Sequence, residues 1–332
     1  MSAARARPGG RPPQPHPPYF AERQYPPSAA GPDAAAGWRP PFVLDLRRTL
    51  GVHARGGGDP AYRVAADNSI WRTSLTPDGP GTIRVREDGE VIRAEAWGPG
   101  GSWLLAALPG ALGAADDRAG FDPAHPLLRE LSTRFPGVRV GRTGRVFEAL
   151  VPAVLEQKVV GVEARRAWRY LLLTFGTPAP GPAPAGMRVP PPAAAWRRIP
   201  SWEWHRAGVE GVRARTIIGA AEVAGRLEEI VTMRGDDADQ RLRSLPGIGV
   251  WTSAEVRQRA CGDADAVSVG DYHLPARVGW ALAGRVVDDA GMLELLAPYP
   301  GHRHRAARLI ELSGLAPPRR GPRMSVRDYR SF

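Results

Sequence analysis

Along the first third of the chain, apolar and polar positions alternate as they do in strands. The alternation runs over residues 62–97, and Asp88-Gly89 interrupts it with the residues of a two-residue hairpin turn. An apolar helical run, GSWLLAALPGAL, follows at residues 101–112. The pattern predicts a small α+β domain with an antiparallel sheet over residues 39–122.

From about residue 123 onward, apolar positions recur every three or four residues, which is the period of an α-helix. Eight segments show this period: 125–135, 146–160, 161–176, 214–230, 237–245, 250–260, 272–284 and 303–314. A Pro-rich stretch at residues 177–192 is expected to be a connecting loop. The pattern predicts a mainly helical region over residues 123–315, and the fold class is therefore α+β.

The two ends of the chain lack such periodicity. Residues 1–38 are rich in Pro, Ala, Gly and Arg, which predicts a disordered tail. Residues 316–332 form a basic tail, which is either simply solvated or binds phosphate loosely.

Composition narrows the class of protein. The chain has 332 residues, of which 43% are hydrophobic, so it can form well-packed cores. It has no apolar run of about 18 residues and no apolar stretch near its first residue, so we expect a cytoplasmic protein without a membrane contact.

The single cysteine, Cys261, excludes an internal disulfide and a Cys-ligated metal site. No ATP loop, zinc pattern or cofactor fingerprint is present, so no cofactor is expected.

The charge points to a polyanionic partner. The formal net charge is +11, and nucleic acid is the commonest polyanion inside a cell. Lys158 is the only lysine among 45 basic residues. It either survived by chance or lies where a slim ammonium side chain serves better than a guanidinium.

A short Gly-rich stretch, SLPGIGVWTS at residues 244–253, lies between two predicted helices. Gly247 and Gly249 would let the backbone approach a partner, and the start of the following helix would offer amides to an anion such as a DNA phosphate. A plain corner between two helices would use the same glycines. Twenty residues after Trp251, VGDYHL places Asp271 at the start of another helix, where N-capping is the simpler explanation.

This order, a PGIG hairpin followed by VGDYHL, resembles the helix-hairpin-helix (HhH-GPD) DNA glycosylases, and within them the DNA-3-methyladenine glycosylase II family. The resemblance extends to the small α+β domain and to VFEALVPAVLEQKVV, which is similar to the family's helix and DNA-wedge loop. It implies a monomeric enzyme that acts on double-stranded DNA containing damaged bases. Such an enzyme flips out alkylated purines, such as 3-methyladenine, and excises them to start base excision repair.

The resemblance also implies roles for particular residues. Asp271 would stabilise positive charge on the deoxyribose and orient or deprotonate the attacking water. Lyase-type relatives carry a lysine where this chain has Trp251, so a monofunctional glycosylase is expected.

For the base pocket, the resemblance implies four positions. Trp251 and Tyr272 match aromatic pocket residues, although core packing would also explain them. Glu255 and His302 stand where aromatic residues are expected. Glu255 would either contact a base or face solvent.

The remaining implied positions contact DNA. They are Gly247, Ile248, Gly249 and Thr252 at the hairpin, and Gln157 and Lys158 at the wedge loop. Backbone carbonyls near Gly247 and Gly249 are candidate ligands for Na⁺ or K⁺. Two alternatives stay open: a damaged-DNA-binding protein that has lost turnover, and a lyase that uses Lys158 as its amine.

Overall fold

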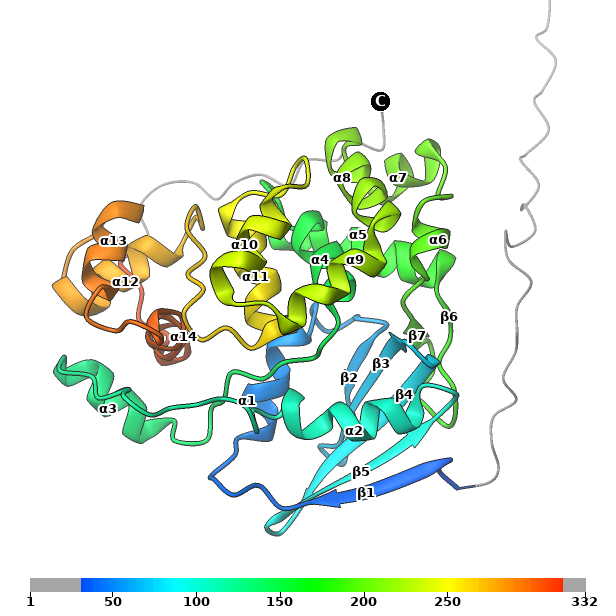
Figure 1. The fold of residues 1–332 in the computed structure, drawn as a ribbon, viewed down its shortest axis with the longest axis horizontal. Helices are drawn as coiled ribbons and strands as arrows, with labels where there is room; N and C mark the ends of the chain where they lie inside the picture. Colours follow the sequence, from blue (N-terminus) through cyan, green and yellow to red (C-terminus); the bar gives the residue numbers. More distant parts are fainter. Residues whose placement is uncertain (1–30, 319–332) are drawn as a thin grey trace, which may run out of the picture.

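A computed structural model describes residues 31–318 and shows a sheet beside a larger body of helices (Figure 1). Most of the two tails predicted at residues 1–38 and 316–332, namely residues 1–30 and 319–332, lies outside the described residues. The α+β class is confirmed. Within the described part, no helix is long and apolar enough to cross a membrane.

The sheet has five antiparallel strands in the order β1-β5-β4-β3-β2. They are β1 (Ala34–Trp38), β2 (Tyr62–Val64), β3 (Ile70–Thr76), β4 (Gly79–Asp88) and β5 (Val91–Trp97). Asp88 pairs with Val91, and Gly89 takes a positive φ of 61°, so the predicted hairpin turn forms. Helix α2 (Gly101–Ala111) packs against β1, β4 and β5.

Strand β1 corrects the predicted tail, because part of the segment assigned to disorder belongs to the sheet. Ala36 pairs with Ala94, and Trp38 pairs with Ile92. The strand lies at the sheet edge, where pairing depends on backbone hydrogen bonds and not on an alternating side-chain pattern. Its sequence, AAAGW, therefore gave no strand signal.

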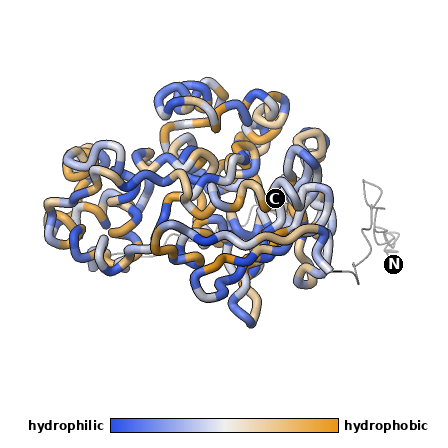
Figure 2. The backbone as a smooth tube through the Cα atoms, turned by 60° about the horizontal axis from the view of Figure 1, so that its bottom comes forward, coloured by the Kyte–Doolittle hydropathy of each residue, from blue (hydrophilic) through white to orange (hydrophobic). Residues whose placement is uncertain are grey.

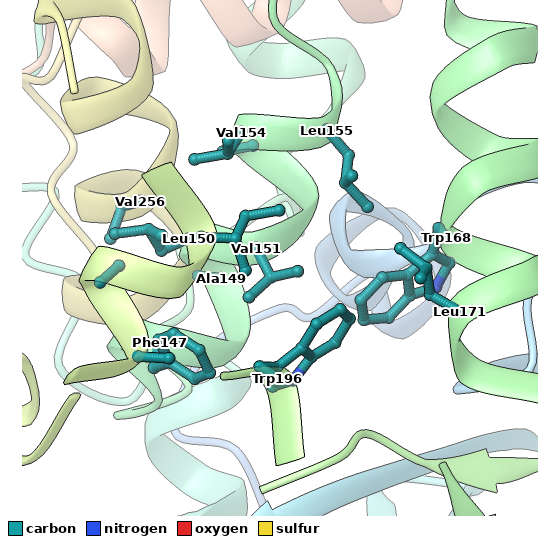
Figure 3. Close-up of a cluster of buried hydrophobic side chains, with 14 of the residues drawn as sticks. Phe147, Ala149, Leu150, Val151, Val154, Leu155, Trp168, Leu171, Trp196 and Val256 are labelled. Carbon is teal, nitrogen blue, oxygen red and sulfur yellow. The ribbon is translucent and has the colours of Figure 1, made fainter. Parts of the chain in front are cut away.

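Helix α4 (Val146–Leu155) is the centre of the first helical subdomain. It contacts α5 (Gly161–Phe175), α8 (Gly211–Glu222), α9 (Ala224–Glu228) and α11 (Val250–Val256). All of its residues except Glu148 are buried. Figure 3 shows Phe147, Leu150 and Val151 of this helix in the same cluster as Trp168 and Trp196.

A second, separate core defines the other helical subdomain. It is formed by α3 (Pro126–Arg134), α12 (Leu274–Ala283), α13 (Asp289–Leu296) and α14 (Arg303–Ser313). Along the backbone as a whole, hydrophobic and hydrophilic positions alternate at short intervals (Figure 2), as expected when most helices and strands bury only one face. The periodicity missed α13, which has eight residues.

The Pro-rich segment is more ordered than a plain loop. It contains β6 (Thr177–Pro178) paired with β7 (Arg188–Val189). The Arg188 amide donates to the Pro60 carbonyl, and the Thr73 hydroxyl donates to the Arg188 carbonyl. The segment therefore fastens the helical part to the sheet.

Shorter elements complete the described chain. They are α1 (Leu46–Leu50), η1 (Gly51–His53), α6 (Ala193–Trp196), α7 (Ser201–Ala207), η2 (Glu229–Thr232), α10 (Gly235–Arg243) and the π-helical turn η3 (Arg257–Cys261) that continues α11. Helices α10 and α11 pack against each other, and the turn of residues 244–249 joins them.

Candidate functional site

The turn between α10 and α11 depends on its two glycines in different ways. Gly247 has a φ of 85°, and a Cβ at this position would lie 2.1 Å from the Thr216 hydroxyl oxygen. At Gly249, a Cβ would meet no atom within 4 Å. Gly247 therefore closes the turn, whereas Gly249 leaves its outer surface open.

The start of α11 offers backbone donors. Its N-cap residue is Gly249, which has no side chain that could accept a hydrogen bond from the first amides of the helix. The amides in the first turn of a helix have no intrahelical acceptor, and the helix dipole favours an anion beside them. A phosphate oxygen is a suitable acceptor for these amides.

Gln157 joins the loop after α4 to this turn. Its side-chain amide donates to the Gly247 carbonyl at 2.9 Å and to the Thr252 hydroxyl at 2.8 Å. Lys158, the next residue, is exposed and takes a left-handed φ of 54°. The structure therefore brings the predicted wedge loop and the predicted hairpin together.

Ile248 and Thr252 support this turn from inside. The Ile248 side chain packs in the main helical core, and its amide donates to the Leu245 carbonyl. Thr252 is buried and accepts the hydrogen bond from Gln157. Both side chains therefore shape the hairpin and do not lie on its outer surface.

Asp271 uses its two carboxylate oxygens differently. Oδ1 accepts from the amides of His273 and Leu274, at 2.8 and 2.9 Å, which holds the turn that leads into α12, whose N-cap residue is His273. Oδ2 accepts from the indole nitrogen of Trp251 at 3.3 Å. The backbone amides before α12 thus account for one oxygen, and the other faces a residue of the hairpin helix.

The two predicted aromatic pocket residues have different surroundings. Trp251 is partly buried, packs against the main helical core and reaches Asp271. Tyr272 is 79% exposed and packs edge-on against the His273 ring. Packing in the hydrophobic core therefore explains part of the Trp251 side chain, but it does not explain Tyr272.

Glu255 lies in an internal polar network and does not face solvent from an exposed helix surface. Its carboxylate accepts from the Ser268 hydroxyl at 2.6 Å and pairs with Arg259 at 2.8 Å. Burial would raise the pKa of Glu255, but Arg259 and Ser268 outweigh it, and the pKa is lowered. Glu255 is therefore a charged partner of Arg259.

The contacts of His302 do not include Asp271, Trp251 or Tyr272, so its place in the base pocket stays a prediction. Its Nε2 lies 3.0 Å from the Ala119 carbonyl, and its ring packs on Phe121. Its Nδ1 accepts from Arg305, whose guanidinium pairs with Asp116. His302 occupies the N-cap position of α14 but makes no side-chain capping hydrogen bond, and its ring bonds Arg305 and the Ala119 carbonyl.

Sequence reasoning missed a set of ionisable residues on α14. His304, Arg308 and Glu311 follow a spacing of four and three residues, which places them along one face of the helix. Arg308 pairs with Glu311 at 3.5 Å. Burial raises the pKa of Glu311, and the charges of Glu255 and Asp271 add to this rise. The sequence shows the helical spacing of these three residues, but it does not show which residues of other elements interact with them.

His304 gives this face of α14 a pH dependence that can be tested. Burial, with Arg308 next in importance, lowers the pKa of its imidazole to about 3. Between pH values of about 6.5 and 3, the unfolded chain therefore binds the proton more readily than the folded chain. Stability should fall as the pH falls through this window, by about 1 kcal/mol for each pH unit.

His304→Gln is expected to make this acid-induced loss of stability shallower. Urea unfolding between pH 7 and 4 would measure the slope. His205→Gln, at an exposed position on α7, is the control and should keep the wild-type slope. Equal slopes for wild type and His304→Gln would contradict the assignment.

Within residues 31–318, no group of three or more His, Cys, Asp or Glu side chains is arranged to hold a metal ion. The carbonyls at the predicted Na⁺ or K⁺ position already have partners. Gly247 accepts from Gln157, and Gly249 accepts from the Ser253 amide. Each carbonyl oxygen keeps a second lone pair for a ligand.

No family model matches the chain, and no curated protein sequence matches it. Solved structures do match. The 3-methyladenine DNA-glycosylase from Archaeoglobus fulgidus is 18% identical, with a TM-score of 0.69 over 84% of this chain and 98% of that one. MBOgg1, in complex with a low-affinity DNA ligand, is 15% identical, with a TM-score of 0.66 over 85% and 96%.

An 8-oxoguanine glycosylase/lyase from Clostridium acetobutylicum, in its apo form, is 11% identical, with a TM-score of 0.65 over 85% of this chain and 97% of that one. The chain therefore shares nearly the whole fold of these DNA glycosylases. The predicted order of a small sheet domain followed by a helical glycosylase fold is confirmed.

Proposed function

We propose that this protein is a monofunctional DNA glycosylase that excises alkylated purines of the 3-methyladenine type from double-stranded DNA. The observation that carries the proposal is the contact between Trp251 Nε1 and Asp271 Oδ2. It holds a carboxylate beside the helix whose start can bind a DNA phosphate. The fold shared with solved DNA glycosylases supports the same conclusion.

DNA binding would use the hairpin and the loop after α4 together. The open surface at Gly249 admits a phosphate, and the free amides of α11 bind it. Lys158, exposed beside the hairpin, would occupy the space that a flipped nucleotide leaves in the base stack. A Na⁺ or K⁺ ion at the carbonyls of Gly247 and Gly249 would strengthen the phosphate contact.

Asp271 would carry the chemistry. As the bond between C1′ and the base nitrogen breaks, positive charge develops on the deoxyribose, and the Asp271 carboxylate stabilises it. The carboxylate also orients a water molecule, whose oxygen bonds to C1′ and whose proton passes to Asp271. An alkylated purine leaves as a neutral base, because its positive charge takes up the electron pair of the broken bond.

The arrangement of amines favours hydrolysis over a lyase reaction. The residue beside Asp271 is Trp251, whose indole cannot form a Schiff base. Lys158, the only lysine of the chain, follows α4 at the exposed wedge loop. Borohydride should therefore trap no covalent DNA adduct.

The test is to incubate the protein with duplex DNA alkylated by dimethyl sulfate and to identify the released bases by chromatography and mass spectrometry. We expect free 3-methyladenine. Duplexes carrying deaminated or oxidised bases, tested in parallel, give the lesion range. Release of no base from any of these duplexes would overturn the glycosylase proposal, and release of other bases alone would overturn the alkylpurine specificity.

A second candidate function is damaged-DNA binding without turnover. The ion pair of Glu255 with Arg259, at a position where the family resemblance implies an aromatic residue, favours it. Tight binding to lesion-containing DNA with no base release would support this second candidate.

Lys158→Ala is expected to weaken binding to abasic-site DNA and to slow excision, each by about tenfold, because the variant loses both the wedge and a charge near phosphate. Fluorescence anisotropy and single-turnover assays would measure the two effects. Arg86→Ala, which removes an exposed charge on β4, is the control for charge alone. Equal behaviour of the two variants would contradict the wedge.

The two hairpin glycines give a matched pair of variants. Gly247→Ala is expected to destabilise the protein by about 2–4 kcal/mol, because the side chain requires a strained φ and clashes with Thr216. Gly249→Ala should leave stability unchanged but weaken DNA binding, since its methyl group would occupy the open surface. Urea unfolding and DNA titration separate the two roles, and the reverse pattern would contradict them.

A further inference from the structure

Asp271 accepts three hydrogen bonds from residues that the structure describes, and one of the three comes from a side chain. Two backbone amides hold Oδ1, and within the described part of the chain Trp251 alone holds Oδ2. The amides fix one oxygen but still allow the carboxylate plane to turn about it. The indole N–H therefore determines where the second oxygen points.

We infer that Trp251 is a positioning residue, which acts through its indole N–H to hold the Asp271 carboxylate in its working orientation. The inference rests on the proposed function and assigns to Trp251 a role other than stacking on a base. Because Oδ2 accepts only this one of the described hydrogen bonds, it keeps a lone pair for water or for the sugar.

The donor is itself held in place. Trp251 lies in the first turn of α11 and packs against the main helical core. The next three residues, Thr252, Ser253 and Ala254, are each at most 2% exposed. A side chain anchored in this way can orient its partner without first becoming ordered during the reaction.

The contact also crosses the boundary between the two helical cores. Trp251 belongs to the first core, and Asp271 precedes α12, whose residues Leu274 and Val278 belong to the second. The hydrogen bond therefore sets the carboxylate relative to the hairpin helix, and not only relative to its own helix.

Three roles for Trp251 make different demands on its side chain. Core packing and base stacking both need an apolar ring. Positioning of the carboxylate needs the N–H. A replacement that keeps the ring system and removes only the N–H therefore separates the third role from the other two.

The experiment replaces Trp251 with β-(3-benzothienyl)alanine, in which sulfur takes the place of the indole N–H, and in parallel tests Trp251→Phe. We expect the single-turnover excision rate of both variants to fall by about 10- to 100-fold, which corresponds to the loss of one hydrogen bond to a charged group. Affinity for abasic-site duplex DNA should stay within twofold of wild type, so that the effect appears in kcat and not in KM.

The same analogue at Trp204 is the control. The Trp204 indole nitrogen is buried and has no hydrogen-bond partner among the described residues, so its replacement should leave the excision rate unchanged. A wild-type rate in the benzothienylalanine variant at Trp251, or a loss of affinity as large as the loss of rate, would overturn the inference.

A readout independent of catalysis separates this inference from the proposed function. The readout is the NMR chemical shift of the Asp271 carboxyl carbon in protein labelled with ¹³Cγ-aspartate, and the signal is assigned by its absence in Asp271→Asn. This chemical shift should change in the Trp251 variants and stay unchanged in the Trp204 variant. A protein that releases no base would overturn the function but could still show this shift. An unmoved signal would overturn the contact itself.

Discussion

The Asp271→Asn variant is expected to release bases on the order of 10²- to 10³-fold more slowly than the wild type, because the developing positive charge on the sugar loses its anionic partner. The variant should fold normally and bind abasic-site DNA as tightly as wild type. Single-turnover release of 3-methyladenine, with anisotropy on the same duplex, measures both properties.

Asparagine is the informative replacement, because Asp271 also accepts two backbone hydrogen bonds at the turn before α12. The carbonyl of Asn can accept from the amides of His273 and Leu274 as Oδ1 does. Asp271→Ala would lose these two hydrogen bonds as well, at a cost of about 1–3 kcal/mol. An unchanged rate in Asp271→Asn would remove this carboxylate from the mechanism.

Arg305→Met is expected to lower the free energy of unfolding by about 3–5 kcal/mol, because it leaves Asp116 charged and buried without its partner. The two side chains are 4% and 1% exposed. Arg305 also donates to the Asp117 carbonyl, and Asp116 also accepts from the Val140 amide. The pair thus fastens α14 to the segments on either side of α3.

Urea unfolding would measure this loss. Arg93→Met, which breaks the exposed pair with Asp88 on the hairpin of β4 and β5, is the control and should leave the free energy of unfolding nearly unchanged. The double variant Asp116→Asn with Arg305→Met should recover part of the loss, since no unpaired charge remains. A loss below about 1 kcal/mol in Arg305→Met would contradict the role assigned to the pair.

The features that the sequence predicted well depend on local chemistry. Gly247 has a positive φ, which the surrounding sequence PGIG already indicates. Asp271 follows Gly270 shortly before a helix, and the local sequence indicates this as well. The hairpin at Asp88-Gly89 is of the same kind. Helix positions in the long, strongly periodic segments also followed from the pattern, because one face of each must be buried.

The features that the sequence missed depend on partners far away along the chain. Asp116 and Arg305 are 189 positions apart, so no local pattern joins them. A distant partner decides the surroundings of His302 as well, because its Nε2 lies 3.0 Å from the carbonyl of Ala119, which is 183 positions away. Trp251 was identified as an aromatic beside the site, but its hydrogen bond to Asp271 became visible only once two subdomains were packed together.

The side chain of Gln157 contacts both the turn at Gly247 and the start of α11. The loop that carries Lys158 and the turn at Gly247 are therefore held at a fixed distance from each other by one side chain. A movement of either segment would break a hydrogen bond of Gln157, so the two segments are expected to move together as a single rigid unit.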